Sequence, residues 1–171
     1  KCGASSVSGC PPPTDPLGPP ICQAALMSII VERLRRAVDL TDGLAADLLP
    51  SALMAHNGAA RSNTIGGQFW CVVGARESYA RAFDARAWQG FTCSLTEPAS
   101  LPSVHAALAS SRDDILVRLS AAEAAIDPAR DAILADLLEH EVQHHGQLIR
   151  FFYANDLSFP TSFAARYALG A

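Results

Sequence analysis

Two histidines four residues apart, His140 and His144, have the residue type and spacing of a metal-binding pair. On an α-helix, residues i and i+4 lie about 40° apart around the axis and about 6 Å apart along it, so both imidazoles can reach one cation. They interrupt a row of apolar residues, Ile133, Leu137, Leu148 and Phe151. A buried imidazole needs partners for both ring nitrogens, which a metal ion and one hydrogen bond would supply. The alternative is that each is an ordinary core histidine bonded to protein groups.

A glutamate follows the first histidine, and the resulting His140-Glu141-Val142-Gln143-His144 opens the zinc metalloprotease signature. In such a protease Glu141 would be the general base, and a third zinc ligand would follow downstream. Beyond residue 145, however, the chain has no histidine or glutamate, and Asp156 is its only acidic residue. Gln147 and Arg150 stand where the extended signature requires glycine and histidine. A HExxH zinc metalloprotease is therefore a remote alternative, and Glu141 is expected on the helix surface or behind the ligands.

His145 lies about 140° around the helix from His140. It is therefore expected on the surface or as a group that supports the ligands rather than as a ligand.

Four amphipathic segments must position these residues, because apolar side chains recur at three- and four-residue spacing along each of them. The expected helices span about 24–40, 62–87, 103–126 and 131–154, with a break at residues 41–43 and short helical turns at 44–49 and after Pro160. These elements predict an all-α, four-helix bundle with up-down-up-down topology. The connection between helices two and three, Trp88 to Pro98, is long enough to cross over the bundle.

The composition fits a soluble domain. The chain has 171 residues, half of them hydrophobic and 18% charged, and no apolar run approaches the roughly 18 residues that span a membrane. A net charge of -4 lacks the basic surface that nucleic acid requires. We therefore expect a cytoplasmic protein with a small-molecule substrate, no nucleic-acid partner and no membrane.

Residues 1–23 form a separate segment, since they hold three of the five cysteines and six of the eleven prolines without helical periodicity. They are expected to be a loosely ordered arm or an addition to the native protein, preceding a bundle domain at 24–171. The chain starts with lysine, and Met27 opens the first amphipathic helix, so Met27 is a candidate native start. Without the arm only Cys71 and Cys93 remain, which suits a reducing cytoplasm.

Three segments resemble the DinB-like superfamily, bacterial four-helix bundles that bind a divalent metal ion through three histidines. They are Leu137 to Ile149, in which Glu139, Gly146 and Gln147 also agree, Thr64-Ile65, and the closing Leu157-Ser158-Phe159-Pro160. The resemblance covers about Leu26 to Leu169. It implies the bundle fold and two of the three metal ligands.

The resemblance also implies a third ligand on helix two, seven residues after the threonine, and counting from Thr64 reaches Cys71 instead of histidine. A cysteine thiolate is a competent ligand, and a His2Cys set with an open fourth position would suit zinc or nickel. The alternative is that Cys71 is a compact core residue and the site is degenerate. His56 is the reserve ligand, and His105 is a weaker candidate.

Metal-dependent chemistry on small molecules is the function that the resemblance implies, of the thiol S-transferase or hydrolase type. The metal would activate a water or a low-molecular-weight thiol. Four side chains are candidates for pocket or supporting groups, although each could instead serve packing or solvation: Gln147, Arg76, Tyr79 and Trp70. The alternative function is a non-catalytic or degenerate bundle that binds a small ligand or acts as a dimeric structural protein. Phe151 and Phe152, on neighbouring faces, suggest a homodimer.

Overall fold

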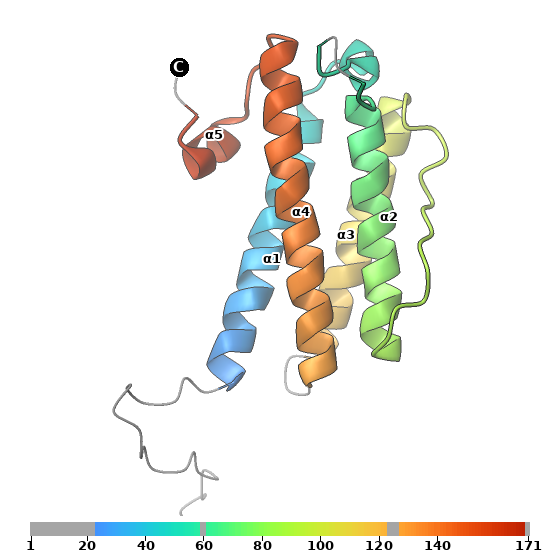
Figure 1. The fold of residues 1–171 in the computed structure, drawn as a ribbon, viewed down its shortest axis with the longest axis vertical. Helices are drawn as coiled ribbons and strands as arrows, with labels where there is room; N and C mark the ends of the chain where they lie inside the picture. The colour runs from blue at the N-terminus through green and yellow to red at the C-terminus, as the bar shows by residue number, and fades with distance from the viewer. Residues whose placement is uncertain (1–22, 59–60, 123–126, 170–171) are drawn as a thin grey trace, which may run out of the picture.

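The computed structural model describes residues 23–58, 61–122 and 127–169. Four long helices lie alongside one another: α1 (Gln23–Ala46), α2 (Ile65–Ala85), α3 (Leu101–Ala122) and α4 (Pro128–Ala154) (Figure 1). A 3-10 turn, η1 (Pro50–Met54), and the short α5 (Thr161–Tyr167) complete the fold. No strand forms in these ranges, which contain one isolated bridge between His56 and Thr64. The prediction of an all-helical, bundle-like fold is confirmed.

Most of the expected N-terminal arm lies outside the described residues, and the helix that follows is longer than predicted. The break expected at residues 41–43 does not occur, since α1 continues to Ala46. Thr41 is fully buried there, and its hydroxyl oxygen lies 3.3 Å from the Ala37 carbonyl oxygen one turn earlier in the same helix. None of the helices in the described part of the chain combines the length and apolar character that a bilayer crossing demands.

The direction of the helices differs from the prediction. Asp84 of α2 pairs with Arg118 of α3, and Arg76 of α2 lies 3.4 Å from the Leu108 carbonyl oxygen of α3. Residue numbers therefore rise together along both helices, so α2 and α3 run in the same direction (Figure 1). The up-down-up-down prediction is wrong, and the order is up, down, down, up.

The physical reason is the connection between α2 and α3, whose predicted length is confirmed. It returns along α2, with Thr92 N donating to Ser78 Oγ at 3.0 Å, and so brings the chain back to the end where α2 began. Gly66 makes this close approach possible, because a Cβ there would overlap the Pro98 carbonyl oxygen. Alternating direction requires short loops, and this connection is not one.

Two apolar clusters form the core, one towards each end of the bundle. One contains Leu44, Val72 and Leu148, and the other contains Leu34, Ile115 and Leu137. Buried polar side chains lie on the helices between them: Thr41, Arg76, Ser111, Glu141, His144 and His145. The bundle thus has a polar layer at mid-height.

Phe151 and Phe152 are 3% and 1% exposed and belong to the first cluster. The expectation that they form an exposed dimer surface is wrong, because α5 and the chain leading to it cover this part of α4: Phe152 stacks on Phe159, which stacks on Phe163. These two residues therefore do not support the homodimer prediction.

Candidate metal centre

Cys71 of α2 and two histidines of α4, His140 and His144, come together in the structure. One potential ligand atom from each lies within 4.8 Å of the others. The two Nε2 atoms are 3.1 Å apart, and Cys71 Sγ lies 3.7 Å from His140 Nε2. Ordinary zinc bond lengths in a tetrahedral site place two nitrogen ligands about 3.3 Å apart, and nitrogen and sulfur about 3.6 Å apart. Both printed distances are close to these values and the Cys71–His144 pair lies within 4.8 Å, so the three side chains form a group that could hold a divalent ion.

The local sequence explains why these helices begin where they do. The Thr64 side chain caps α2 and accepts a hydrogen bond from Gly67 N at 3.1 Å. The Asp127 side chain caps α4, accepting from Ala129 N and Arg130 N, and Pro128 supplies a preformed first turn. Seven residues into α2 and thirteen into α4, the Cys71 and His140 side chains then meet across the pair of helices.

Gln68 holds His144 from the other side of its ring. The amide oxygen of Gln68 lies 2.6 Å from His144 Nδ1, and the amide nitrogen donates to Asn63 Oδ1 at 2.6 Å. An amide oxygen can only accept, so Nδ1 carries the proton and Nε2 presents its lone pair to His140 and Cys71. Sequence reasoning missed Gln68, although its position one turn before Cys71 on α2 was a usable signal.

The protonation states suit a metal ion. Burial lowers the pKa of His140. Burial and the neighbouring His140 lower the pKa of His144 to about 4. Both imidazoles are therefore neutral at pH 7, as ligands must be. Burial raises the pKa of the Cys71 thiol, so a metal ion would have to displace its proton.

Aromatic side chains flank the group on its outer side. His144 is buried, whereas His140 and Cys71 are only half-buried. The Tyr79 ring centroid lies 6.5 Å from that of His140, and Trp88, 54% exposed, packs edge-on against Tyr79 at 5.2 Å. Of the predicted pocket residues, Tyr79 is therefore beside the group, and Trp88 joins it from the connection to α3.

Two further predicted pocket residues lie differently. Trp70 is next to Cys71 in sequence, but its ring packs against Phe91 at 5.2 Å. Gln147 is exposed on α4. Neither side chain has a contact that ties it to the histidines.

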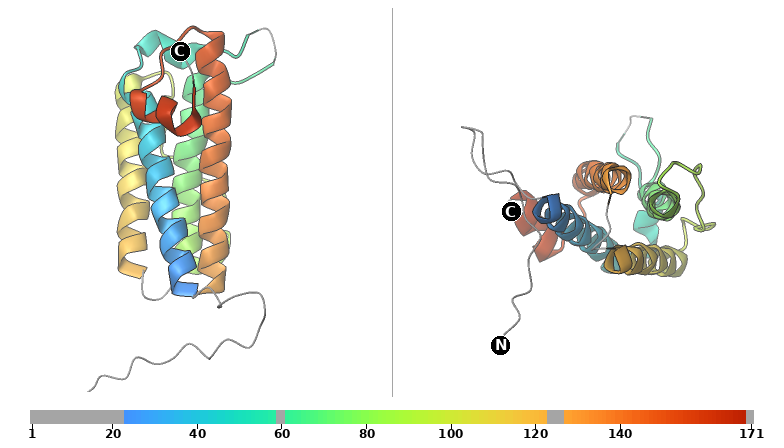
Figure 2. Two further views of the ribbon diagram at one scale, coloured as in Figure 1. Left: turned by 90° about the vertical axis from the view of Figure 1, so that its left-hand side faces the viewer. Right: turned by 90° about the horizontal axis from the view of Figure 1, so that it is seen from below.

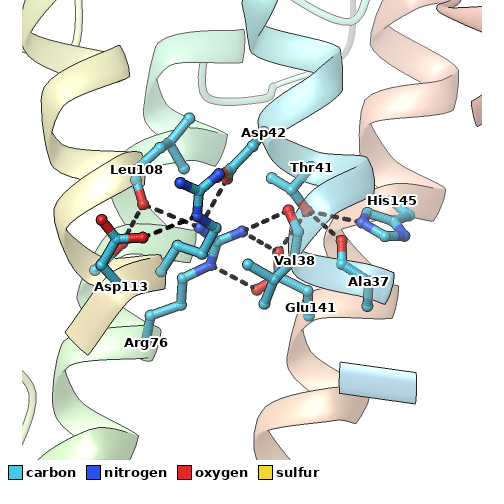
Figure 3. A network of polar contacts seen from close by, with 11 residues as sticks. Ala37, Val38, Thr41, Asp42, Arg76, Leu108, Asp113, Glu141 and His145 are labelled. Carbon is cyan, nitrogen blue, oxygen red and sulfur yellow. Dashed lines mark hydrogen bonds and ion pairs between the residues drawn. The ribbon is translucent and has the colours of Figure 1, made fainter. Parts of the chain in front are cut away.

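Glu141 and Arg76 are not where the sequence predicted. Glu141 has no exposed surface, and Arg76 grips both its oxygens, with Nη2 to Oε1 at 2.7 Å and Nε to Oε2 at 3.2 Å (Figure 3). Arg76 Nη1 also donates to Asp42 Oδ1 at 2.8 Å. Residue 141 points to the bundle axis rather than to the helix surface, so the expected surface position of Glu141 and the expected pocket role of Arg76 are both corrected.

His145 belongs to the same buried network and is not a surface group. Its Nδ1 lies 2.6 Å from the Tyr167 hydroxyl, and its Nε2 lies 2.7 Å from Thr41 Oγ1, which in turn contacts Glu141. One assignment of protons satisfies every partner: Tyr167 donates to His145, His145 to Thr41, and Thr41 to Glu141. The network therefore joins α5, through Tyr167, to α1, α4 and α2. Figure 3 shows the contacts among Thr41, Arg76, Glu141 and His145.

The environment of Glu141 argues against the protease interpretation. Burial alone would raise the pKa of its carboxyl, but the charge and hydrogen bonds of Arg76, with the hydrogen bond of Thr41, hold that pKa below its ordinary value. A carboxylate held in this way is a poor general base, because accepting a proton would break its ion pair with Arg76.

The reserve ligands lie outside the group of three. His56 is exposed on the loop before α2, where its Nδ1 lies 3.3 Å from the Ser62 carbonyl oxygen. His105 Nε2 lies 2.8 Å from the Ala45 carbonyl oxygen, near the end of α1. Each histidine has a structural contact elsewhere.

Comparison of the chain with protein-family models, curated proteins and solved structures gives no match. The group formed by Cys71, His140 and His144 is therefore interpreted from its geometry and from the chemistry of its side chains.

Proposed function

We propose that this protein binds a divalent metal ion, zinc or nickel, through Cys71, His140 and His144. The observation that carries the proposal is the close approach of the three potential ligand atoms: two of the distances, 3.1 and 3.7 Å, are close to those of a tetrahedral site, and all three lie within 4.8 Å. The neutral histidines and the hydrogen bond from His144 to Gln68 support it. Nickel fits the same soft and imidazole ligands.

We further propose that the protein is a metal-dependent enzyme that acts on small molecules, of the thiol S-transferase or hydrolase type, and a member of the DinB-like superfamily. Three protein ligands leave a fourth position open, which distinguishes catalytic from structural zinc sites. A metal ion bound there would lower the pKa of a water or a low-molecular-weight thiol. The helix-four motif and the helical fold support the family assignment.

The chain's own residues would orient and shield a substrate. Gln68 fixes the ring of His144, and the Tyr79 and Trp88 rings provide an apolar wall beside His140. Burial, with the charges of Asp136 and Glu139, raises the pKa of Tyr79. Its hydroxyl therefore keeps its proton at neutral pH and can donate a hydrogen bond to a substrate oxygen or sulfur.

Metal content tests the binding proposal. Protein supplemented with zinc or nickel should retain about one ion per chain after gel filtration, and His140→Ala and His144→Ala should abolish this retention. His56→Ala and His105→Ala are matched controls that should retain the ion, since these histidines lie outside the group. A wild-type protein that stays metal-free after supplementation would reject the proposal and favour the non-catalytic bundle.

Proton release tests whether Cys71 is a ligand. Both histidines are neutral at pH 7 and the thiol is protonated, so zinc binding should release about one proton from Cys71. Cys71→Ala should release about one proton fewer than the wild type, as measured by a pH indicator in weak buffer, and Cys93→Ala should match the wild type. Equal release by wild type and Cys71→Ala would remove Cys71 from the ligand set.

Turnover tests the enzymatic proposal separately. The zinc-loaded and nickel-loaded proteins should accelerate the transfer of a low-molecular-weight thiol to a small electrophile, or the hydrolysis of a small ester or amide. His140→Ala should abolish the acceleration. A protein that binds metal fully but accelerates none of these reactions would be a binding or structural bundle.

A further inference from the structure

A cavity of about 480 Å³ lies between α1, α4 and α5, away from the metal centre. Its α4 wall consists of Leu138 and Val142. These positions are rotated by about 160° around the helix from His140, so the cavity and the metal centre occupy different faces of α4. Figure 2 shows α5 lying across α1 beside α4. From α5, Arg166 and Tyr167 line the cavity.

Positive charge dominates the lining. Three arginines, Arg33 and Arg36 from α1 and Arg166 from α5, surround the cavity, and Glu32 is the one acidic residue among its lining side chains. Glu32 forms an ion pair with Arg36, with Oε1 2.9 Å from Nη2. Within the described ranges neither Arg33 nor Arg166 forms an ion pair, and Arg166 stacks over the Tyr167 ring with its Cζ 5.7 Å from the centroid. Two guanidinium groups thus border the cavity without a counter-charge among its walls.

The rest of the lining is apolar. Ala37 and Leu40 are buried at its α1 wall, whereas Ile29 and Val142 are 45% and 42% exposed. The Tyr167 hydroxyl is already bonded to His145, so this residue offers mainly its ring. Arg33 and Arg166 are solvent-exposed, and a ligand with an apolar body and an anionic end would cover the apolar walls while its charge faces these two cations.

We propose that this cavity binds a small carboxylic acid with an aliphatic or aromatic body, with the carboxylate between Arg33 and Arg166. The planar guanidinium fork matches a carboxylate, and the apolar walls provide contact area for the body. A bare inorganic anion would leave the apolar walls exposed, and a neutral lipid would leave the arginines unpaired. The site is independent of the proposed metal and of the reaction proposed above.

Calorimetric titration of the full chain with octanoate at low ionic strength tests the proposal. One octanoate should bind per chain, and Arg33→Ala and Arg166→Ala should each weaken its affinity about two- to fivefold, the scale of one lost ion pair near solvent. Arg150→Ala, which removes an exposed arginine of α4 outside the cavity, is the matched control and should bind like the wild type. Added salt should weaken octanoate binding.

Two comparison ligands distinguish this site from a nonspecific anion-binding site and from a nonspecific hydrophobic surface. Octanol should bind at least tenfold more weakly than octanoate, because it lacks the charge, and inorganic phosphate should bind at least tenfold more weakly, because it lacks the apolar body. Amide signals of Ile29, Val142 and Tyr167 should shift on octanoate binding. Equal affinity for octanol or phosphate, equal binding by both arginine variants, or no saturable binding of octanoate would each overturn the proposal.

Discussion

Gln68→Ala should weaken metal binding although the residue is not a ligand. Gln68 is 3% exposed, and its amide oxygen accepts the Nδ1 proton of His144 at 2.6 Å. This bond fixes the tautomer that leaves His144 Nε2 free, 3.1 Å from His140 Nε2. In the variant the ring can rotate, or it can move its proton to Nε2, where a metal ion would have to displace it.

The expected loss follows from this geometry. Removing the partner of a histidine ligand lowers metal affinity about 10- to 100-fold, or about 1.4 to 2.8 kcal/mol. The upper half of this range applies here, since His144 is 5% exposed and water cannot easily replace the amide. Gln68→Glu should instead retain the affinity, because a carboxylate oxygen can accept the same proton.

Competition against a chelator of known zinc affinity measures the effect. Gln147→Ala is the matched control, because it removes the same kind of side chain from an exposed position of α4 one turn after His144. Urea unfolding of each metal-free variant checks that the fold persists. Unchanged zinc affinity in folded Gln68→Ala, or an equal loss in Gln147→Ala, would refute the tautomer argument.

Three further predictions concern the fold. Glu141→Ala should lower the free energy of unfolding by about 3–5 kcal/mol in urea, because Arg76 keeps a buried, unpaired charge, and the double variant Glu141→Leu, Arg76→Met should be less destabilising. Gly66→Ala should destabilise by about 1–3 kcal/mol in the same assay, because its Cβ would meet the connection to α3. The hydrogen bond from Arg86 lowers the pKa of the Asp127 carboxyl in the folded protein. The ionised carboxylate therefore stabilises the fold at pH values above its unfolded-state pKa, and this stabilisation is lost as the pH falls through its folded-state pKa. In Asp127→Asn, the free energy of unfolding measured in urea should therefore decrease less steeply as the pH is lowered through this acid range.

The proximity of the two candidate ligands on α4 was predictable because their relation is local. His140 and His144 sit four residues apart on one helix, and an α-helix converts that spacing into proximity without help from the rest of the fold. Cys71 was a weaker prediction, since it is 69 residues away and was reached only by counting from Thr64 in a resemblance. Its distance to His140 depends on how α2 packs against α4, which no local pattern specifies.

The buried network was not predictable for the same reason. A glutamate in an amphipathic pattern is ordinarily assigned to the surface, because burying a charge without a partner costs several kcal/mol. Glu141 is buried because Arg76 and Thr41 reach it from positions 65 and 100 residues away. The direction of α3 was mispredicted for a similar reason. The sequence shows that the connection after α2 is long, but it does not show that this connection returns along α2 past Ser78.

The ligand group and the buried network share one helix, and this arrangement couples them. Positions 140 and 144 of α4 face α2, while Glu141 and His145 both contact Thr41 of α1, so rotation of α4 would move both sets together. The ion pair of Glu141 with Arg76 ties α4 to α2 at a fixed height, and the Cys71 thiol lies five residues before Arg76 on that same helix. The network therefore sets the rotation and register at which His140 meets Cys71. A buried ion pair often contributes little net stability, but breaking it leaves an uncompensated charge, so it disfavours other arrangements of these helices, and the arrangement it favours here is the one that brings the proposed metal ligands together.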